Sequence, residues 1–301
     1  MVKYKVFNID DERQITLLKL IGMGTFSKVY MSELLDKKNN TSNRLVCKIY
    51  KFCKRKFKDN IDIFNLSKVH PSIYIEHYYE TIIINLKKGH KIMSFFEPLG
   101  PDLYKYKTLD ETILFRIILD VSYGLQHLHN VCKLVHMDLK CSNIVWCTQL
   151  HLDNPKLFID SQLVKLIDIG SALELNSVVE MPMQLRQFRH PSCFTIKPHV
   201  IKIFFDIWSM GCLFYEIYFG HCLFELLSEN TIDTEKLFNK KSNKILLQEF
   251  YTECLVYIKS KINKLEMETN HITKITLKIL RQTSVENVLK ILHPAMPDKG
   301  V

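Results

Sequence analysis

The sequence predicts an α+β protein with two lobes, a small β-rich N-terminal lobe and a larger, mainly α-helical C-terminal lobe. Up to about residue 97, short runs of β-branched and aromatic residues alternate with turns, a pattern typical of strands. Farther along the chain, apolar residues recur at helical spacing. The segment 97–101, Glu-Pro-Leu-Gly-Pro, separates the two patterns and has the rigid composition of a hinge. We therefore predict one domain over 1–301, with an N-lobe at about 1–97, a hinge at 97–101 and a C-lobe at about 102–293.

The expected elements follow one another in a simple order. A polar stretch at 36–43 separates the second and third strands as a hairpin turn, and the His-Pro pair at 70–71 closes the first helix. Residues 111–129 place apolar side chains along a broad helical face, which predicts a long helix at the start of the C-lobe. In the N-lobe we expect strands at 15–21, 28–34 and 45–50, a helix at 59–69, and strands at 74–86 and 91–97 joined by a turn at 87–90.

Composition indicates an ordinary globular protein, with 47% hydrophobic and 24% charged residues. The formal charge of +9 favours an anionic partner, although the excess is spread along the chain and also fits a mildly basic, solvated surface. Nine cysteines occur without CxxC spacing, so reduced thiols in the cytoplasm or nucleus are expected in place of disulfides or a zinc site. The N-terminus is charged where a signal peptide needs an apolar run.

One stretch, 203–227, is apolar enough to suggest a membrane span. Four ionisable residues interrupt it, namely Asp206, Glu216, His221 and Glu225. Ionisable groups inside a bilayer are costly. We therefore expect a buried helix here and no association with a membrane.

Two features of the N-lobe suggest that it handles phosphate. Gly22 and Gly24 lie between two expected strands, where the backbone N–H groups of a glycine turn can approach an anion, although a purely local hairpin turn explains the same pair. Because a strand follows these glycines, the pattern argues against a dinucleotide-binding fold, which needs a helix there. Lys48 lies inside an apolar strand, where an ammonium group needs anions beside it unless it reaches water at the strand edge.

The strongest chemical signal lies in residues 135–145, where Asp138 is followed by Lys140 and Asn143. Phosphoryl transfer needs an acceptor for the proton of the attacking hydroxyl, a cation near the migrating group, and hard oxygen ligands for Mg²⁺. These three side chains supply such groups on one loop. An apolar strand then ends at Asp168 in the pattern Asp-x-Gly, which adds a carboxylate for a metal.

In this order the residues resemble the signature set of the eukaryotic-type protein kinases, over nearly the whole chain. The likeness is greatest to the SR-protein kinases and the CDC-like (LAMMER) kinases, whose glycine loop also has a serine where Ser27 stands. The other segments that carry it are 96–100, 124–129, 132–136, 184–189, 205–212, Gly220 and 223–225.

The resemblance implies a bilobal protein-kinase fold and transfer of the γ-phosphoryl group of ATP, with Mg²⁺, to serine or threonine hydroxyls of proteins. It makes Asp138 the catalytic base and Lys140 the cation at the γ-phosphate. Asn143 and Asp168 would bind Mg²⁺. Asp206 would brace the catalytic loop from the buried helix.

The resemblance also implies a set of nucleotide-binding residues in the N-lobe. Lys48 would hold the α- and β-phosphates, with Asp62 as its partner on the helix. The backbone of Glu97 and Leu99 would bind adenine beneath Phe96. The full set is Ile21, Gly22, Gly24, Ser27, Val29, Lys48, Asp62, Phe96, Glu97 and Leu99.

Two departures from the family pattern bear on the nucleotide and on regulation. Asp62 is one methylene shorter than the family's glutamate, and Glu76 is a second candidate that falls after the expected helix. Met137 occupies a position where many kinases have an arginine that would bind a phosphate in the activation loop, and the SR-protein kinases lack this arginine too. We therefore expect activity that does not depend on activation-loop phosphorylation.

Two further departures concern the C-lobe. Leu185 stands where the family has a threonine that bonds the catalytic aspartate and lysine. Ser192 stands where an acidic residue would pair with a buried late arginine, here Arg281. Because an unpaired buried guanidinium is costly, either Arg281 finds another acceptor or this part of the lobe is rebuilt.

The predicted function is a serine/threonine protein kinase, with Arg-Ser-rich proteins as a substrate class by resemblance and no cofactor besides ATP and Mg²⁺. The alternative is a catalytically weak pseudokinase that acts as a binding scaffold, which Leu185, Ser192 and Asp62 favour. The basic run at 51–58 also fits nucleic-acid binding or nuclear import, but a solvated loop explains it more simply, and no nucleic-acid partner is expected. We expect a monomeric, minimal kinase, cytoplasmic or nuclear. Its Lys-, Ile- and Asn-rich usage is typical of an AT-rich viral or parasite genome, which would place it in the host cell.

Overall fold

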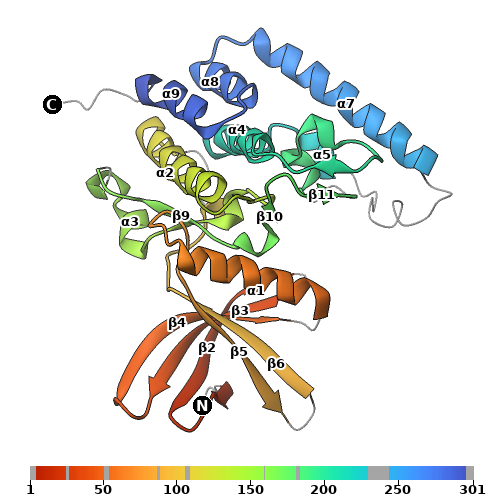
Figure 1. The fold of residues 1–301 in the computed structure, drawn as a ribbon. Helices are drawn as coiled ribbons and strands as arrows, with labels where there is room; N and C mark the ends of the chain where they lie inside the picture. The colour runs from red at the N-terminus through yellow and green to blue at the C-terminus, as the bar shows by residue number, and fades with distance from the viewer. Residues whose placement is uncertain are drawn as a thin grey trace. The chain divides into compact units, whose positions relative to one another are not determined.

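The computed structural model describes residues 5–24, 27–50, 54–86, 89–105, 109–158, 160–180, 184–229 and 244–295 (Figure 1). The chain divides into two compact units, Met1–Leu99 and Gly100–Val301, and the boundary falls inside the expected hinge. The first unit is built around a β-sheet and the second is mainly helical. The predicted α+β fold class is therefore confirmed.

The first unit contains a six-stranded antiparallel sheet in the order β1-β2-β3-β4-β6-β5. Its strands are β1 (Lys5–Asn8), β2 (Arg13–Met23), β3 (Ser27–Asp36), β4 (Thr41–Tyr50), β5 (Tyr78–Leu86) and β6 (Gly89–Phe96). Side chains alternate between the two faces, so one face collects the buried residues Ile15, Cys47, Met93 and Phe95 as a core. The short edge strand β1 was not predicted, because its four residues are largely exposed and show no apolar alternation.

Helix α1 (Lys54–Val69) lies against β5 (Figure 1). Sequence spacing predicts Ile63, Leu66 and Val69 as its contact face, and this is wrong in detail, since Val69 is 70% exposed. The helix instead buries Phe64, whose ring stacks on that of Tyr78 with a centroid distance of 5.3 Å. An aromatic ring removes more apolar surface from water than an aliphatic side chain, so Phe64 sets the rotation of the helix.

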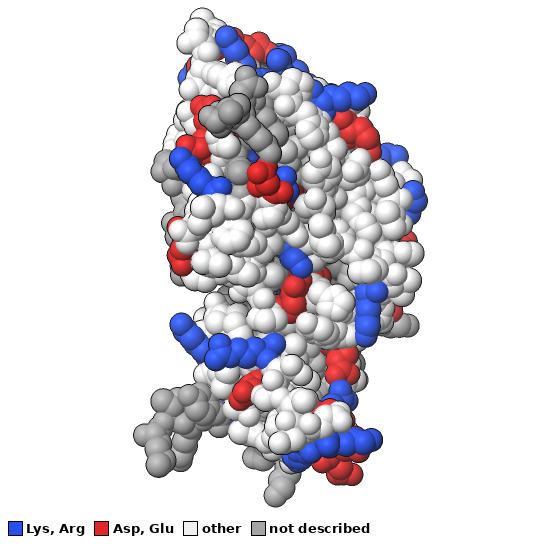
Figure 2. All heavy atoms as spheres, turned by 90° about the vertical axis from the view of Figure 1, so that its left-hand side faces the viewer, with Lys and Arg blue, Asp and Glu red and all other residues white. Residues whose placement is uncertain are grey.

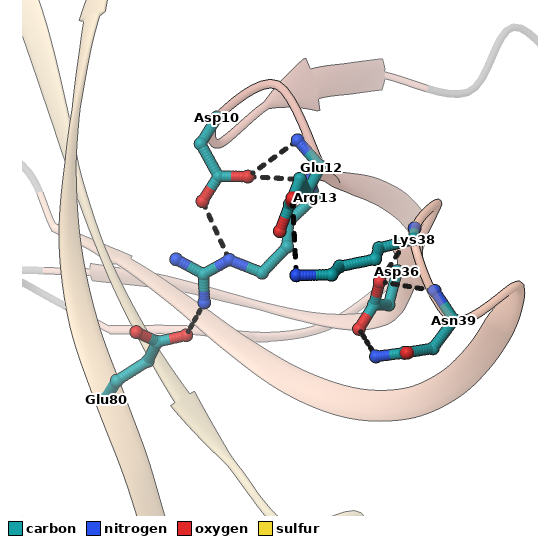
Figure 3. Close-up of polar contacts among 7 residues, drawn as sticks. All are labelled: Asp10, Glu12, Arg13, Asp36, Lys38, Asn39 and Glu80. Carbon is teal, nitrogen blue, oxygen red and sulfur yellow. Dashed lines mark hydrogen bonds and ion pairs between the residues drawn. The ribbon is translucent and has the colours of Figure 1, made fainter.

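The sheet curls enough to bring together strands that are not neighbours in it. Arg13, at the start of β2, donates from Nη1 to Oε1 of Glu80 on the far-edge strand β5, at 2.6 Å (Figure 3). Asp10 holds the same guanidinium group through Oδ2, and its Oδ1 accepts from the backbone N–H of Arg13 at 2.6 Å. In the β3–β4 turn, Asp36 accepts from the backbone N–H of Asn39 at 3.0 Å. Turn carboxylates thus set the hairpin geometry, and one arginine joins the two sides of the sheet.

The second unit contains seven α-helices among its described residues and three short antiparallel strand pairs. The helices are α2 (Glu111–Asn130), α3 (Gln149–Asp153), α4 (Phe204–Phe219), α5 (Glu225–Glu229), α7 (Lys244–Glu266), α8 (His271–Leu280) and α9 (Val285–Ala295). The strand pairs are β7 (Leu134–Val135) with β10 (Leu173–Glu174), β8 (Ile144–Trp146) with β9 (Val164–Leu166), and β11 (Val178–Val179) with β12 (His199–Val200). The short pairs carry the loops on which the candidate catalytic residues lie.

Helix α4 is the buried helix that the sequence predicts at 203–227, but it is shorter. It ends at Gly220, whose φ of 77° is left-handed and suits glycine, and α5 begins five residues later at Glu225. On its buried side, a β-carbon at Gly211 would lie 2.7 Å from a methyl carbon of Leu280 in α8, so the two helices pack closely there. No helix in the described part of the chain is both long and apolar enough to cross a membrane.

Helix α9 docks on α2 through polar contacts. Glu286 of α9 accepts hydrogen bonds from Asn130 at 2.9 Å and Gln126 at 3.3 Å. The hydrogen bond from Asn130 is the main reason that the pKa of Glu286 falls to about 2.

On the face of the molecule seen in Figure 2, basic and acidic side chains are interspersed with uncharged surface.

Candidate active site

The loop between β7 and β8 is held by a buried carboxylate. Asp206, at the start of α4 and fully buried, accepts from the backbone N–H of His136 at 2.7 Å and from that of Met137 at 3.0 Å. Its Oδ2 also lies 2.9 Å from Nε2 of buried His129. Burial alone would raise the pKa of Asp206, but the hydrogen bond and the charge of His129 lower it below the usual value. Asp206 therefore stays ionised and fixes the loop backbone, which confirms its predicted bracing role.

His136 connects this loop to the segment that precedes Asp168. Its Nδ1 accepts from the backbone N–H of Asp138 at 3.2 Å, and its Nε2 lies 3.2 Å from the carbonyl oxygen of Ile167. A backbone amide can only donate and a carbonyl can only accept. The ring is therefore assigned as neutral, with its hydrogen on Nε2. A buried imidazole thus couples the positions of the two segments.

Three predicted catalytic-loop side chains meet at one carboxylate oxygen. Lys140 Nζ lies 2.8 Å from Oδ2 of Asp138, and Asn143 Nδ2 lies 2.9 Å from the same oxygen. Asn143 Nδ2 also donates to the backbone oxygen of Asp138 at 2.7 Å. Because both partners are acceptors, the amide orientation is fixed and its Oδ1 is the remaining acceptor. The side chains of Asp138 and Lys140 are 21% and 28% exposed, so both are only partly buried.

Pairing of β8 with β9 brings Asn143 and Asp168 to the same end of a two-stranded ribbon. Ile144 is the register partner of Leu166, and the backbone N–H of Ile167 donates to the carbonyl of Asn143 at 3.0 Å. Asp168 follows directly, in a left-handed conformation with φ 60° and ψ 44°. A non-glycine residue in this conformation costs about 1–3 kcal/mol and is characteristic of functional sites. Holding the backbone of Asp168 in this conformation, which sets where its carboxylate begins, therefore costs conformational free energy.

Sequence reasoning missed Asp120, which organises the other end of β9. This α2 residue is 1% exposed, and its Oδ2 accepts from the backbone N–H groups of Leu163 at 2.7 Å and Val164 at 3.2 Å. Its Oδ1 lies 2.8 Å from Nη2 of Arg116. Burial raises the pKa of Asp120 to about 6, although the charge of Arg116 acts in the opposite direction. The sequence did contain a sign of this role, because Asp120 falls within the apolar face of the helix expected at 111–129. A buried carboxylate without partners is rare, so an aspartate at such a position indicates that it binds other groups.

In the first unit, the glycine loop is the turn of the β2–β3 hairpin. Gly22 pairs with Val29, and the backbone N–H of Gly24 donates to the carbonyl of Ser27 at 2.9 Å. Ile21 is 48% exposed and Ser27 is 6% exposed. The two residues at the tip, 25–26, lie outside the described residues. A β-carbon at Gly22 would make only ordinary contacts with Val29, so local packing alone does not require a glycine there.

Lys48 lies in β4, where its register partners are Val29 of β3 and Ser94 of β6. The predicted ion pair with Asp62 is absent from the part of the chain that the structure describes, and Asp62 is exposed on α1. The reason is the rotation of α1, because residues two apart in a helix do not share a face and Phe64 points into the core. The assignment of Asp62 as the helix partner of Lys48 is therefore corrected.

The predicted adenine-binding segment begins with a buried aromatic residue. Phe96 is 2% exposed, and its ring lies 5.2 Å from that of Phe64 and 5.6 Å from that of Tyr78, measured between centroids. The backbone N–H of Glu97 donates to the carbonyl of His77 at 3.0 Å, and Oε1 of Glu97 accepts from the N–H of His77 at 2.7 Å. The backbone N–H of Glu97 is therefore already bonded within the first unit, and the adenine contact of Glu97 stays a prediction. Leu99, which ends the first unit, stays a prediction.

Gly100 opens the second unit at a place where only glycine fits. Its N–H donates to the carbonyl of Trp146 at 2.8 Å, and the N–H of Trp146 donates to the carbonyl of Pro101 at 3.0 Å. A β-carbon on Gly100 would lie 2.9 Å from backbone atoms of Trp146 and Thr148. Since backbone atoms cannot move aside as a side chain can, this contact fixes the start of the unit onto β8.

The departure at Leu185 leaves the catalytic pair intact. Leu185 is 43% exposed and carries no hydroxyl, yet Lys140 and Asp138 pair directly at 2.8 Å. Ser192, the second departure, is an exposed residue whose Oγ lies 2.8 Å from Nδ1 of His190. Neither change removes a group that the catalytic loop uses.

Arg281 does not become an unpaired buried cation. Its side chain is 61% exposed and forms an ion pair with Glu266 at the end of α7. The buried guanidinium of this region belongs instead to Arg189, which is 5% exposed and donates from Nε and Nη2 to the carbonyl of Gln184 at 3.1 and 2.7 Å. Burial lowers the pKa of Arg189, and the electrostatic interaction with Tyr251 partly opposes this. The sequence left two outcomes open, another acceptor for Arg281 or a rebuilt part of the lobe. The first is the one observed, and the acceptor is Glu266.

The donor set around the catalytic loop fits a Mg²⁺ ion. The Oδ1 atom of Asn143 and the carboxylate of Asp168 are hard oxygen ligands at the same end of the β8–β9 ribbon. Mg²⁺ is held in proteins by a small number of such oxygens, together with water and substrate phosphates. These two residues would hold the ion, as the sequence predicts.

Comparison with known proteins defines the class. A family model described as "Protein kinase domain" matches residues 15–283, and the chain therefore belongs to the protein kinase family. Members of this family generally use ATP and Mg²⁺.

Three relatives illustrate the similarity. The chain is 26% identical to Dual specificity protein kinase YAK1 of Saccharomyces cerevisiae, over 74% of this chain and 27% of that protein. It is 29% identical to human Dual specificity tyrosine-phosphorylation-regulated kinase 4, over 72% of this chain and 40% of the relative. It is 27% identical to Serine/threonine-protein kinase AFC3 of Arabidopsis thaliana, over 73% and 58% respectively. The chain thus spans less than two thirds of each relative, and the narrower likeness to SR-protein and LAMMER kinases stays a prediction.

Proposed function

We propose that this protein is a serine/threonine protein kinase that transfers the γ-phosphoryl group of MgATP to protein hydroxyls. The observation that carries the proposal is the partly exposed carboxylate of Asp138, held by Lys140 and Asn143 on a loop whose backbone is fixed by buried Asp206. A carboxylate in these surroundings can accept a proton, and a cation stands directly beside it.

Each residue has a separate role in this proposal. When bound, MgATP supplies the phosphoryl group and a metal ion that offsets its charge. Asp138 orients the substrate hydroxyl and accepts its proton, and Lys140 stabilises negative charge next to that carboxylate. Asn143 keeps Asp138 in place through Nδ2, and with Asp168 it would hold the metal. In the first unit, Lys48 would hold the α- and β-phosphates.

Turnover of the purified chain tests the proposal. With MgATP and a generic basic protein substrate, we expect phosphate incorporation by the unmodified chain and a loss of about 10²–10⁴-fold in kcat for Asp138→Ala, because the proton acceptor is removed. Nucleotide binding, measured by the rise in Tm on addition of MgATP, should be retained in both proteins. If the unmodified chain and Asp138→Ala are equally inactive while both bind nucleotide, the pseudokinase alternative replaces the enzyme.

The substrate class rests on resemblance alone. Arg-Ser-rich proteins are the class proposed for the SR-type likeness, although the net charge of +9 offers such basic substrates no electrostatic attraction. Two relatives carry the words "dual specificity" in their names, so tyrosine must be tested as an acceptor too. A peptide array with serine, threonine and tyrosine acceptors in Arg-Ser, acidic and mixed contexts separates these possibilities. We propose a monomer that acts in the cytoplasm or nucleus.

We also propose that activity does not require a phosphate in the activation segment. Met137 is 1% exposed and adopts a left-handed φ of 64°, so the position that would bind such a phosphate holds a buried thioether. Ser177, a candidate acceptor, donates its hydroxyl to the carbonyl of Glu174 at 2.7 Å. In the same assay, phosphatase treatment should leave turnover unchanged, and a large loss would contradict this proposal.

A further inference from the structure

The helical end of the second unit contains a hollow that the proposed chemistry does not use. It encloses about 680 Å³ and is formed by α8 and α9 together with the end of α7. Residues that line it come from Glu266 at one end to Ala295 at the other, so the catalytic loop at 136–143 contributes none of them. The hollow is therefore a separate surface feature.

Four lysine and arginine side chains line this hollow, which we call the basic pocket. Lys274 and Lys278 of α8 and its C-cap residue Arg281 follow one another at helical spacing, and Lys290 of α9 also lines the pocket. Among the residues lining it, the sole carboxylate belongs to Glu266, and Arg281 is paired with it. Within the described part of the chain, the three lysines have no ion-pair partner.

This arrangement is unfavourable without an anion. Like charges four residues apart, as Lys274 and Lys278 are, repel each other and destabilise a helix. Lys290, placed on a second helix of the same hollow, adds to the positive potential. A ligand with several negative charges would remove this repulsion, so the charge pattern selects an anionic partner.

The apolar part of the pocket indicates which anionic partner fits. Half-buried Ile291 and Ala295 line it, with Pro294 between them on the same helix. These are aliphatic surfaces that match an aliphatic side chain. Single-stranded nucleic acid is bound mainly by stacking on aromatic side chains. The described residues that line this hollow include no Phe, Tyr or Trp, and their one aromatic ring is the imidazole of His271 at the start of α8. The lining therefore favours a peptide over a nucleic acid.

We propose that the basic pocket binds an acidic segment of a partner protein. Aspartate or glutamate carboxylates of that segment pair with Lys274, Lys278 and Lys290, and one of its aliphatic side chains lies on Ile291 and Ala295. The site recruits a substrate or regulator to the second unit without using the catalytic residues.

A synthetic peptide of repeated Glu-Asp-Leu triplets, labelled with fluorescein, serves as the probe, and fluorescence anisotropy measures its affinity for the full chain. We expect the double variant K274Q/K278Q to bind it about five- to tenfold more weakly, because two ion pairs are lost. The matched control K259Q/K264Q removes the same charge from two exposed lysines of α7 that do not line the pocket, and its affinity should stay within about twofold. Because glutamine is uncharged, the double substitution also removes the repulsion between Lys274 and Lys278 in α8. The Tm of K274Q/K278Q should therefore not fall.

Several outcomes would overturn the proposal. They are no binding of the probe by the unmodified chain, equal weakening in the control variant, or displacement of the probe by single-stranded RNA at lower concentrations than by the unlabelled peptide. Ile291→Asn should weaken binding of the probe, but it should not weaken binding of a second peptide in which each Leu is replaced by Ser. If the unmodified chain bound the two peptides with equal affinity, the apolar contact would be refuted. Asp138→Ala should bind the probe normally, so loss of catalysis and loss of docking are distinguishable.

Discussion

The two units of this protein hold their functional side chains in different ways. In the second unit, the groups around Asp138 are tied to buried anchors, and Asp206 alone accepts two backbone hydrogen bonds from the catalytic loop. In the first unit, Lys48 lies in a strand while the carboxylate predicted to pair with it, Asp62, is exposed. The second unit therefore presents a prearranged catalytic loop, whereas the predicted phosphate-binding lysine of the first unit lies in a strand and does not pair with Asp62.

The difference follows from burial. A carboxylate removed from water must be compensated by hydrogen bonds in a defined geometry, so a buried anchor such as Asp206 or Asp120 constrains the backbone that it binds. An exposed carboxylate is compensated by water and constrains little. Preorganised dipoles are what stabilise charge in a transition state, so the buried anchors matter most where the charge develops.

The largest expected effect comes from Asp206→Ala. The change leaves the N–H groups of His136 and Met137, and the ring of His129, without their acceptor in a buried site. Removing one partner of such a network costs about 3–5 kcal/mol. We expect a fall of this size in the free energy of urea unfolding, and a loss of kcat of about a hundredfold or more, because misplaced catalytic groups are costly.

The matched control applies the same substitution at the exposed Asp62. If Asp206→Ala and Asp62→Ala changed unfolding and kcat by similar amounts, the distinction between anchored and exposed groups would be lost. If Asp206→Ala is too unstable to purify, that outcome supports the predicted fall in the free energy of unfolding. The kcat would then be measured at low temperature with Asp206→Asn, which keeps one acceptor oxygen.

A second, smaller effect concerns Asp120 and depends on pH. Burial raises the pKa of this carboxyl to about 6 from the usual 3.8, so the folded state binds a proton more tightly than the unfolded state. Its contribution to stability is therefore fully present below about pH 4 and is lost as the pH rises through about 6. Asp120→Asn keeps an acceptor for Leu163 and Val164 but removes the titration.

Urea unfolding at several pH values between 4 and 7 measures this effect. Relative to the unmodified chain, Asp120→Asn should gain stability as the pH rises, by an amount on the order of a few kcal/mol across the range. A difference between the two proteins that is constant with pH would show that Asp120 is not the titrating group. Asp153→Asn, an exposed substitution of the same kind in α3, should show no such pH-dependent difference.

Local patterns were enough to predict much of the fold. The strands β2, β3 and β4 and the helix α2 were all predicted within a few residues, because alternation and helical spacing are properties of short segments. The same holds for Asp138, Lys140 and Asn143, which lie on one short loop and are brought together by its local geometry.

Features that depend on distant contacts were not predicted. The rotation of α1 is set by packing of Phe64 on Tyr78, fourteen residues later, and no local spacing reveals it. Asp120 gains its role only when the start of β9 reaches α2. In the same way, the requirement for glycine at Gly100 arises from the backbone of Trp146. These are tertiary contacts, which a single sequence does not show.

The smallest expected effect tests the first unit directly. Asp62→Ala should change the KM for ATP by less than about twofold, since its exposed carboxylate makes no ion pair within the described residues. Lys48→Met should raise that KM or lower kcat by at least about tenfold, because a charge-assisted contact with phosphate is lost. Steady-state kinetics with varied MgATP measures both. A large effect of Asp62→Ala would mean that α1 turns to pair Asp62 with Lys48 once the nucleotide binds. The first unit would then also rely on an ion pair of its own, one that forms only with the ligand, whereas the anchors of the second unit are already in place.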